Sequence, residues 1–209
     1  GCKRLCVDTN YYATFNQDNV ELVDVNASAI ESITKTGLKT TSTEYHFDSL
    51  ILATGFDAMT GALLSIDIKG PSNQTLKDHW RDGPTNFLGL SINGFPNLFM
   101  ITGPGSPSVL ANMIVAIEQH VDFIADLLVS MRGANQMRVE ASLEAELSWV
   151  ETVNRIADQT LFPRGCKSWY TGSNIPGKPR VFMPYLGYPS YVEKCNEIAA
   201  EGYRGFDFA

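Results

Sequence analysis

Apolar residues along the chain form short continuous runs, which are typical of buried strands, and longer stretches with the spacing of a helix. The runs at residues 49–53 and 97–101 consist mostly of Leu, Ile, Ala, Phe and Met, as expected for strands covered on both faces. Each run leads into a turn that contains glycine, and the second then leads into a helical pattern. This order of elements predicts an α/β fold with parallel strands.

The first quarter of the chain predicts further, shorter strands. Residues 5–7 are apolar, and residues 20–25 are rich in valine that alternates in part with acidic residues. Three segments then follow closely and predict a small antiparallel β-meander, at residues 29–34, 38–41 and 43–47. The meander adds an antiparallel element to the α/β fold.

Helical spacing of apolar residues begins near Ser106. That serine suits an N-cap, Pro107 suits the first helical turn, and Gly133 ends the pattern. The apolar positions of this helix are Leu110, Met113, Ile114, Ile117, Val121, Ile124 and Leu128. We expect them to form its buried face.

Two more helices are predicted nearer the C-terminus. One spans residues 142–160, and the other spans residues 190–201 and stops at Gly202. The apolar positions of the first are Leu143, Leu147, Val150 and Ile156. Residues 56–96 and 161–190 are dense in residues that favour turns, so we expect loops with short elements there.

Composition excludes several classes of partner. The chain has 16 basic and 23 acidic residues among 209, whereas nucleic-acid binding needs clustered cations. No apolar run reaches the roughly 18–20 residues of a membrane span. The four cysteines form no CxxC pair, and the three histidines lack the spacing of metal ligands. We expect no nucleic acid, no membrane span, no metal, and free thiols in a reducing cytoplasm.

The turn at residues 103–108 is a candidate anion site. It joins a predicted strand to a predicted helix, so free backbone N–H groups and the helix dipole would face an anion there. In a flavoenzyme such a turn suits the pyrimidine end of the flavin. An ordinary strand-to-helix connection is the alternative.

Three other segments carry weaker signals. Residues 53–57 place small residues at a strand end, where a cofactor or backbone can approach closely. Residues 169–178 gather indole, hydroxyl and amide donors, as in many ligand sites, although a surface loop that buries its tryptophan is equally consistent. Lys3 and Arg4 form a basic doublet that could hold an anion or be a solvated surface pair.

Taken in order, these segments closely resemble the C-terminal part of type I Baeyer–Villiger monooxygenases, the FAD- and NADPH-dependent flavoproteins that include phenylacetone and cyclohexanone monooxygenases. The resemblance covers nearly the whole chain. The matching segments read GCKR (1–4), YY (11–12), FNQDNV (15–20), LATGFDA (52–58), GPGSPSVLANM (103–113), IEQHV (117–121) and SWYTGSNIPGKPR (168–180). The resemblance implies the end of an NADPH-binding domain with the meander at residues 1–48. Residues 49–209 would be the C-terminal part of an FAD-binding domain with substrate and cofactor loops.

The resemblance also implies roles for single residues. Arg4 matches the arginine that stabilises the anionic flavin peroxide and its adduct with a ketone, and it therefore counts as both catalytic and cofactor-binding. Lys3 matches the residue that binds the 2′-phosphate of NADPH. Met113 lies in the segment that contacts the flavin, and Trp169 matches the residue that hydrogen-bonds the nicotinamide cofactor. Residues 53–57 resemble the linker between the two nucleotide domains.

The implied activity inserts one oxygen atom of O2 next to a ketone carbonyl and gives an ester or lactone. The glycine motifs for FAD and NADPH do not occur in the sequence, which leads us to expect a C-terminal fragment that lacks the N-terminal half of the same enzyme. Two alternatives stay open. One is a related flavin monooxygenase that oxidises amine nitrogen or sulfur, and the other is a non-catalytic interaction domain.

Overall fold

The described residues divide into two compact units, residues 6–55 and residues 56–209. The computed structural model describes residues 6–107, 110–165, 168–173, 175, 177–178, 185 and 187–209. The basic doublet Lys3–Arg4 lies outside the described residues.

The first unit is built around the expected meander, which the structure confirms. Strands β1 (Ile30–Ile33), β2 (Gly37–Thr40) and β3 (Glu44–His46) pair antiparallel in the order β1-β2-β3. A short helix, α1 (Tyr11–Thr14), precedes them. The three strands are short and are joined by tight turns, so each forms hydrogen bonds with a strand close to it in the sequence. The sequence pattern of short strands separated by turns therefore predicts their positions.

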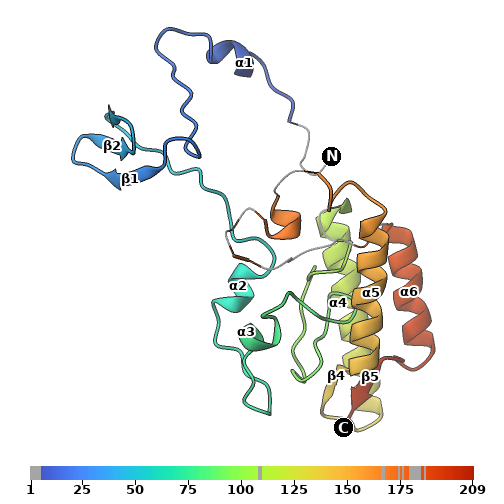
Figure 1. Cartoon of the computed structure of the whole chain (residues 1–209). Helices are drawn as coiled ribbons and strands as arrows, with labels where there is room; N and C mark the ends of the chain where they lie inside the picture. Colours follow the sequence, from blue (N-terminus) through green and yellow to red (C-terminus); the bar gives the residue numbers. More distant parts are fainter. Residues whose placement is uncertain are drawn as a thin grey trace. The chain divides into compact units, whose positions relative to one another are not determined.

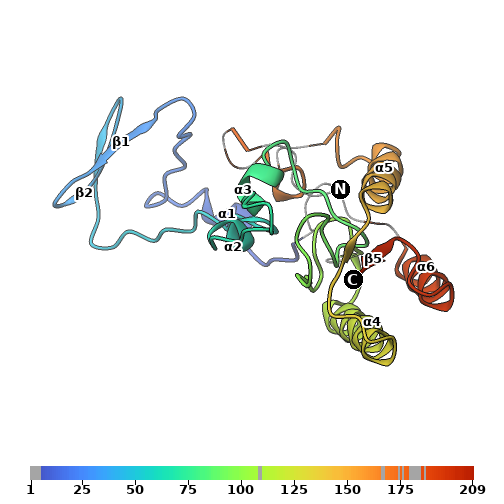
Figure 2. The ribbon, with the colours of Figure 1, turned by 90° about the horizontal axis from the view of Figure 1, so that it is seen from below.

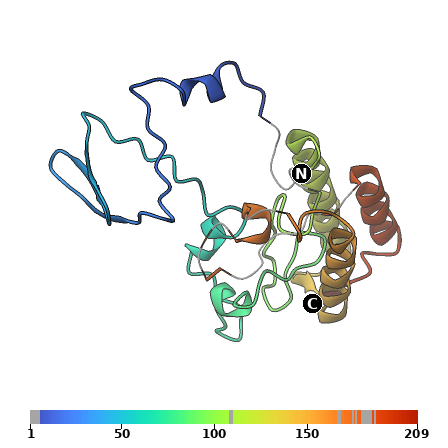
Figure 3. The ribbon, with the colours of Figure 1, turned by 45° about the horizontal axis from the view of Figure 1, so that its top comes forward.

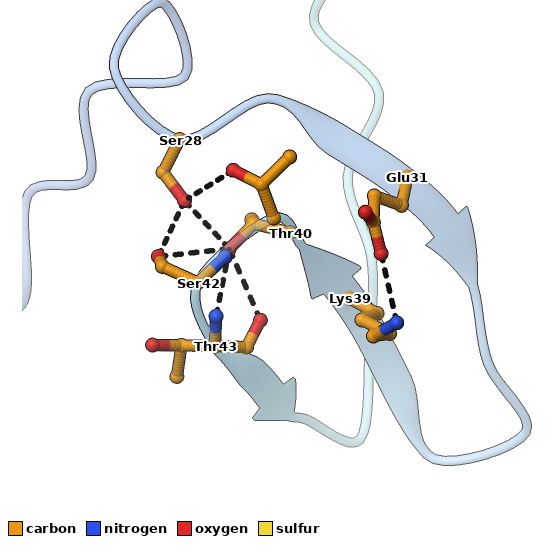
Figure 4. Close-up of polar contacts among 7 residues, drawn as sticks. Ser28, Glu31, Lys39, Thr40, Ser42 and Thr43 are labelled. Carbon is orange, nitrogen blue, oxygen red and sulfur yellow. Dashed lines mark hydrogen bonds and ion pairs between the residues drawn. The ribbon is translucent and has the colours of Figure 1, made fainter.

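Hydroxyl groups rather than apolar side chains close one end of this sheet (Figure 4). The buried Thr40 hydroxyl accepts a hydrogen bond from Ser28 Oγ at 2.8 Å, and it contacts both the N–H and the carbonyl oxygen of Thr43. Ser28 Oγ also lies 2.6 Å from Ser42 Oγ. On the exposed surface, Lys39 of β2 pairs with Glu31 of β1. Such a sheet is stabilised mainly by local polar contacts.

Three expected strands are not formed among the described residues of this unit. Residues 20–24 have no secondary structure, and residues 49–53 are exposed and outside any sheet. Residues 6–7 of the expected first strand are also irregular. A strand needs a hydrogen-bonding neighbour, and none pairs with these runs among the described residues.

The second unit contains three long helices whose axes run roughly side by side (Figures 1 and 2). They are α4 (Met113–Gly133), α5 (Leu143–Asp158) and α6 (Tyr188–Ala200). Shorter elements are α2 (Gly61–Leu64), α3 (Leu76–His79) and the single-turn helix η2 (Trp169–Thr171). The loop character expected for residues 56–96 is confirmed.

A two-stranded antiparallel sheet joins the helices near the C-terminus. Strand β4 (Val139–Ala141) pairs with β5 (Phe206–Phe208). The main core lies between α4, α5, α6 and this sheet, and its most buried members include Leu127, Val139, Tyr191 and Cys195. A second apolar cluster surrounds Leu76, Trp80, Ile92, Phe95 and Met100.

The mixed α/β composition is confirmed, but the ladders seen among the described residues are antiparallel rather than parallel. The apolar run at residues 97–101 contributes one isolated bridge, between Phe99 and Ser91. Met100 of this run is buried, so the run belongs to the core without being a regular strand.

Helix α5 begins at the expected serine, and α4 begins later than expected. Ser142 Oγ accepts a hydrogen bond from Ala145 N–H at 3.3 Å and so caps α5. The cap of α4 is Asn112 and not Ser106, because Asn112 Oδ1 accepts from Ile114 N–H at 3.0 Å. Ser106 lies instead in a buried turn.

The buried faces of both helices also differ from expectation. In α4 the buried residues are Ala116, His120, Phe123, Leu127 and Met131, whereas Ile114, Val121 and Leu128 are exposed. In α5 the buried residues are Glu146, Trp149, Val153 and Ala157, whereas Leu143 and Leu147 are exposed. Both helices carry apolar residues on more than one face, so periodicity alone did not identify the packed face.

No helix within the described ranges is both long and apolar enough to cross a bilayer. The same residues hold no cluster of three or more side chains that could bind a metal ion.

Candidate functional site

The glycine-rich turn at residues 103–106 is clasped against a second loop, residues 86–89. Buried Asn86 makes the link twice, because its Nδ2 donates to Pro104 O at 2.8 Å and its Oδ1 accepts from Gly89 N–H at 2.7 Å. Gly103 N–H donates to Gly89 O at 3.2 Å, and Ser106 Oγ donates to Gly103 O at 2.8 Å. We call residues 86–89 and 103–106 together the glycine clasp.

Protein atoms fill the space beside the glycines of this clasp. A Cβ on Gly103 would collide with the carbonyl oxygen of Gly89. A Cβ on Gly89, whose φ is +75°, would lie 2.8 Å from Ser106 Cβ. Internal packing therefore explains these glycines. The helix start expected near Ser106 is wrong, because α4 begins seven residues further on, at Met113. The anion site expected at this turn stays a prediction.

A buried chain of hydrogen bonds connects the glycine clasp to α4 and α6. His120 Nδ1 accepts from Thr102 N–H at 2.9 Å, so Nε2 carries the ring proton and faces Tyr191 Oη at 3.0 Å. Tyr191 Oη in turn donates to Leu88 O at 2.8 Å. Thr102 and Leu88 both have positive φ angles, 54° and 60°, which are unfavourable for residues with a Cβ. These hydrogen bonds therefore hold two strained positions, Leu88 inside the clasp and Thr102 directly before its second loop.

Burial lowers the pKa of His120 from 6.5 to about 4. Between these two pH values, His120 therefore binds a proton in the unfolded chain but not in the folded protein. We expect the contribution of His120 to stability to be complete above about pH 6.5 and to be lost as the pH falls toward about 4, by on the order of 3 kcal/mol. Urea unfolding as a function of pH measures this directly.

Two variants make this pH prediction specific. In His120→Gln that part of the pH slope should disappear, whereas His46→Gln, which alters an exposed histidine, should keep it. An unchanged slope in His120→Gln would show that other groups control acid unfolding.

The start of α4 offers a different kind of surface. Met113, the first helical residue, is half-buried, and Leu110, Ile114 and Val115 nearby are 43%, 65% and 42% exposed. Helix N-termini present backbone N–H groups to acceptors, and Asn112 caps the N–H of Ile114. Apolar side chains therefore lie exposed beside the first turn of α4.

Trp169 begins η2, so it comes from an element separate from Met113. Its ring stacks on Tyr170, with centroids 4.2 Å apart and planes at 20°. Tyr170 is buried and packs against Met59 and Phe162. Lys178 ion-pairs with Asp57 of the expected linker segment. The Trp169 segment is therefore attached to the segment that starts at Asp57 at two points.

Of the expected site residues, the structure places Met113 and Trp169, while Lys3 and Arg4 fall in the part of the chain that it does not describe. The roles of all four residues stay predictions. Sequence reasoning missed Asn86, which looked like one more polar residue in a loop, and Tyr191, whose link to His120 spans 71 positions. No local signal could have identified either contact.

Known proteins match this sequence over its whole length. No model of a protein family matches the sequence. The chain is 44% identical over 210 residues to cyclopentanone 1,2-monooxygenase of Comamonas sp. (strain NCIMB 9872), covering 100% of this chain and 38% of the relative. A structure of oxidized steroid monooxygenase bound to NADP matches with a TM-score of 0.84 and 46% identity, covering 100% of this chain and 39% of that one. A structure of OTEMO in complex with FAD and NADP matches with a TM-score of 0.90 and 36% identity, covering 100% and 38%.

A relative with a different named activity is also similar. Phenazine N-monooxygenase PhzNO1 of Lysobacter antibioticus is 37% identical over 98% of this chain and 38% of its own length. The chain thus spans less than two fifths of the length of the curated relatives that it matches. A protein named Baeyer-Villiger monooxygenase, of Pseudooceanicola batsensis, is 41% identical over 96% of this chain and 37% of its own length. Over its full length, the chain is therefore a homologue of the Baeyer–Villiger monooxygenases.

Proposed function

We propose that this chain supplies the C-terminal part of an FAD- and NADPH-dependent Baeyer–Villiger monooxygenase that acts on ketones with O2. The observation that carries the proposal is the match over the complete chain, at 44% identity, to a relative named for oxidation of a cyclic ketone. The cofactor assignment is supported by neighbours solved with NADP and with FAD and NADP.

Bound FAD would supply the transfer of electrons from NADPH to O2. In this chain the start of α4 around Met113 would hold an edge of the flavin, and Trp169 would donate a hydrogen bond to the nicotinamide cofactor. Arg4, as a permanent cation, would stabilise negative charge that develops beside the ketone. His120 and Tyr191, both fully buried, would hold the backbone at Thr102 and Leu88, and burial favours the neutral imidazole of His120.

Exposed apolar residues support the view that more protein belongs to the enzyme. Ile51, Leu52 and Phe56 are 87%, 71% and 88% exposed. We propose that an N-terminal half covers this run and carries the glycine motifs for both cofactors. We also propose a cytoplasmic location, which suits the buried thiol of Cys195.

Oxidation of amine nitrogen is a second candidate function, favoured by the similarity to phenazine N-monooxygenase. A substrate panel separates the two. The purified full-length protein with NADPH would be incubated with cyclic ketones and with nitrogen heterocycles, and products would be identified by mass spectrometry. Esters or lactones from ketones support the main proposal, whereas N-oxides alone would replace it with the second.

Lys3 is proposed to bind the 2′-phosphate of NADPH. Lys3→Ala should weaken NADPH binding by about tenfold or more and leave NADH binding nearly unchanged, because only NADPH carries the phosphate that an ammonium can pair with. Stopped-flow measurement of flavin reduction gives both affinities. Lys35→Ala, which alters an exposed lysine in the turn between β1 and β2, is the matched control. Equal losses for both nucleotides would contradict a phosphate contact.

A further inference from the structure

Helix α4 carries a row of apolar side chains that are left largely exposed. Ile114, Val121 and Leu128 are 65%, 48% and 47% exposed. They are spaced seven residues apart, which is close to two helical turns, so they form one row over about 21 Å of the helix. Half-buried Ile117 and Ile124 border this row. We call these five residues the α4 stripe.

The α4 stripe is distinct from the face of the helix that packs in the core. That face holds the buried residues Ala116, Phe123 and Leu127, and helical geometry puts the stripe about a quarter of a turn away from it. Helix α4, drawn in yellow-green in Figures 2 and 3, lies at the edge of the group of long helices. A helix that is apolar on more than one face is typical of the interior of a larger structure.

Charges on the same helix indicate which kind of partner the stripe fits. Glu118, Asp122 and Asp126 follow at intervals of four residues beside it, and none of them forms an ion pair with a described residue. A lipid bilayer is a poor partner, because its anionic lipids repel such a row and because ionised carboxylates are costly in hydrocarbon. A protein surface, with an apolar centre and a polar rim, suits this pattern.

The relatives are much longer than this chain, and their extra length indicates which protein surface this is. The whole chain aligns with only 38% of cyclopentanone 1,2-monooxygenase and with 39% of the steroid monooxygenase structure. More than half of each relative therefore has no counterpart in this sequence. The stripe also begins beside Met113, the residue proposed to hold the flavin, so a part of the enzyme that carries FAD would lie against this end of α4.

We propose that the α4 stripe is the surface on which the N-terminal half of the full-length enzyme packs. Apolar side chains of that half cover Ile114, Val121 and Leu128, and the row of carboxylates stays at the rim. Removal of this apolar surface from water drives the contact. The inference rests on the proposed function for the existence of an N-terminal half, and it adds the place on this chain where that half is held.

Thiol labelling of the purified full-length protein tests whether the stripe is covered. Val121→Cys and Leu128→Cys each place a thiol in the stripe, and Ser130→Cys places one at an exposed polar position of the same helix as the matched control. Each variant is treated with N-ethylmaleimide, and peptide mass spectrometry follows the introduced cysteine separately from the four native ones. We expect the two stripe cysteines to react at least about tenfold more slowly than the control in the native protein, and equally fast in urea.

Cross-linking identifies what covers the stripe. Glu118→Cys at the rim, modified with benzophenone maleimide and irradiated, should link to residues that precede this chain in the same polypeptide. Links only to residues 1–55, or a covalent dimer of two copies, would overturn the proposal, and so would stripe cysteines that react as fast as Ser130→Cys.

Ketone turnover by the same preparation is measured separately. Ester formation with an unprotected stripe would refute this inference and leave the proposed function standing. Protection and the expected cross-links without ester formation would support the inference and count against the function.

Discussion

Replacement of Arg4 by alanine is expected to lower the rate of ester formation by about 10²–10³-fold while NADPH continues to reduce the flavin. The reason is electrostatic. In the proposed reaction, reduction of the flavin by NADPH would precede the development of negative charge next to the ketone, so only the later step would need the fixed cation. A guanidinium remains protonated at any working pH, so its loss removes a charge that no buffer component replaces. Product analysis and stopped-flow spectroscopy measure the two steps separately.

Arg155→Ala provides the matched control for this variant. Arg155 is an exposed arginine in the last turn of α5, so its removal changes net charge equally and should leave both steps intact. NADPH consumption without ester should accompany the loss in Arg4→Ala. An ester yield equal to that of the wild-type enzyme would refute the role of Arg4.

Gly89→Ala is expected to lower the free energy of unfolding by about 2–5 kcal/mol. About 1–2 kcal/mol comes from forcing a residue with a Cβ into the left-handed region, and about 1–3 kcal/mol from overpacking. The overpacking arises because the new Cβ would lie 2.8 Å from Ser106 Cβ and 3.1 Å from Gly103 O, inside the glycine clasp. Urea unfolding monitored by circular dichroism measures the loss.

Gly94→Ala isolates the conformational part of this effect. Gly94 has a φ of +81°, similar to that of Gly89, but no atom lies within 4 Å of the position that a Cβ would take there. Its replacement should therefore cost only about 1–2 kcal/mol. Equal destabilisation by the two substitutions would mean that the clasp is not tightly packed.

Elements with local signals could be predicted from the sequence. The meander was located because its strands are adjacent and short, and α5 was located from Ser142, whose hydroxyl does cap it. The end of α4 at Gly133 was also predicted. In each case the deciding interactions lie within a few residues of one another.

Elements that depend on distant partners could not be predicted. The apolar run at residues 49–53 resembles a buried strand, but the described residues offer it no neighbour and it stays exposed. The packed face of α4 is set by contacts such as that of His120 with Tyr191, and a helix that is apolar on several faces gives no periodic indication of which face will pack.

The candidate site also has a part that could be predicted from the sequence and a part that could not. Lys3, Arg4, Met113 and Trp169 were named through resemblance to a family, because a basic doublet or a tryptophan in a loop is not specific by itself. The attachments of the Trp169 segment, Tyr170 to Met59 and Lys178 to Asp57, join positions more than a hundred residues apart. Only the fold brings those side chains together.

Oxygen-isotope labelling tests the central claim most directly. The purified full-length protein would be given NADPH, a cyclic ketone and ¹⁸O2, and the product would be analysed by mass spectrometry. We predict a lactone that carries one ¹⁸O atom, with the second oxygen atom released as water. A product that lacks the label, or an unchanged ketone alongside full oxidation of NADPH, would contradict the assignment of this chain to a ketone monooxygenase.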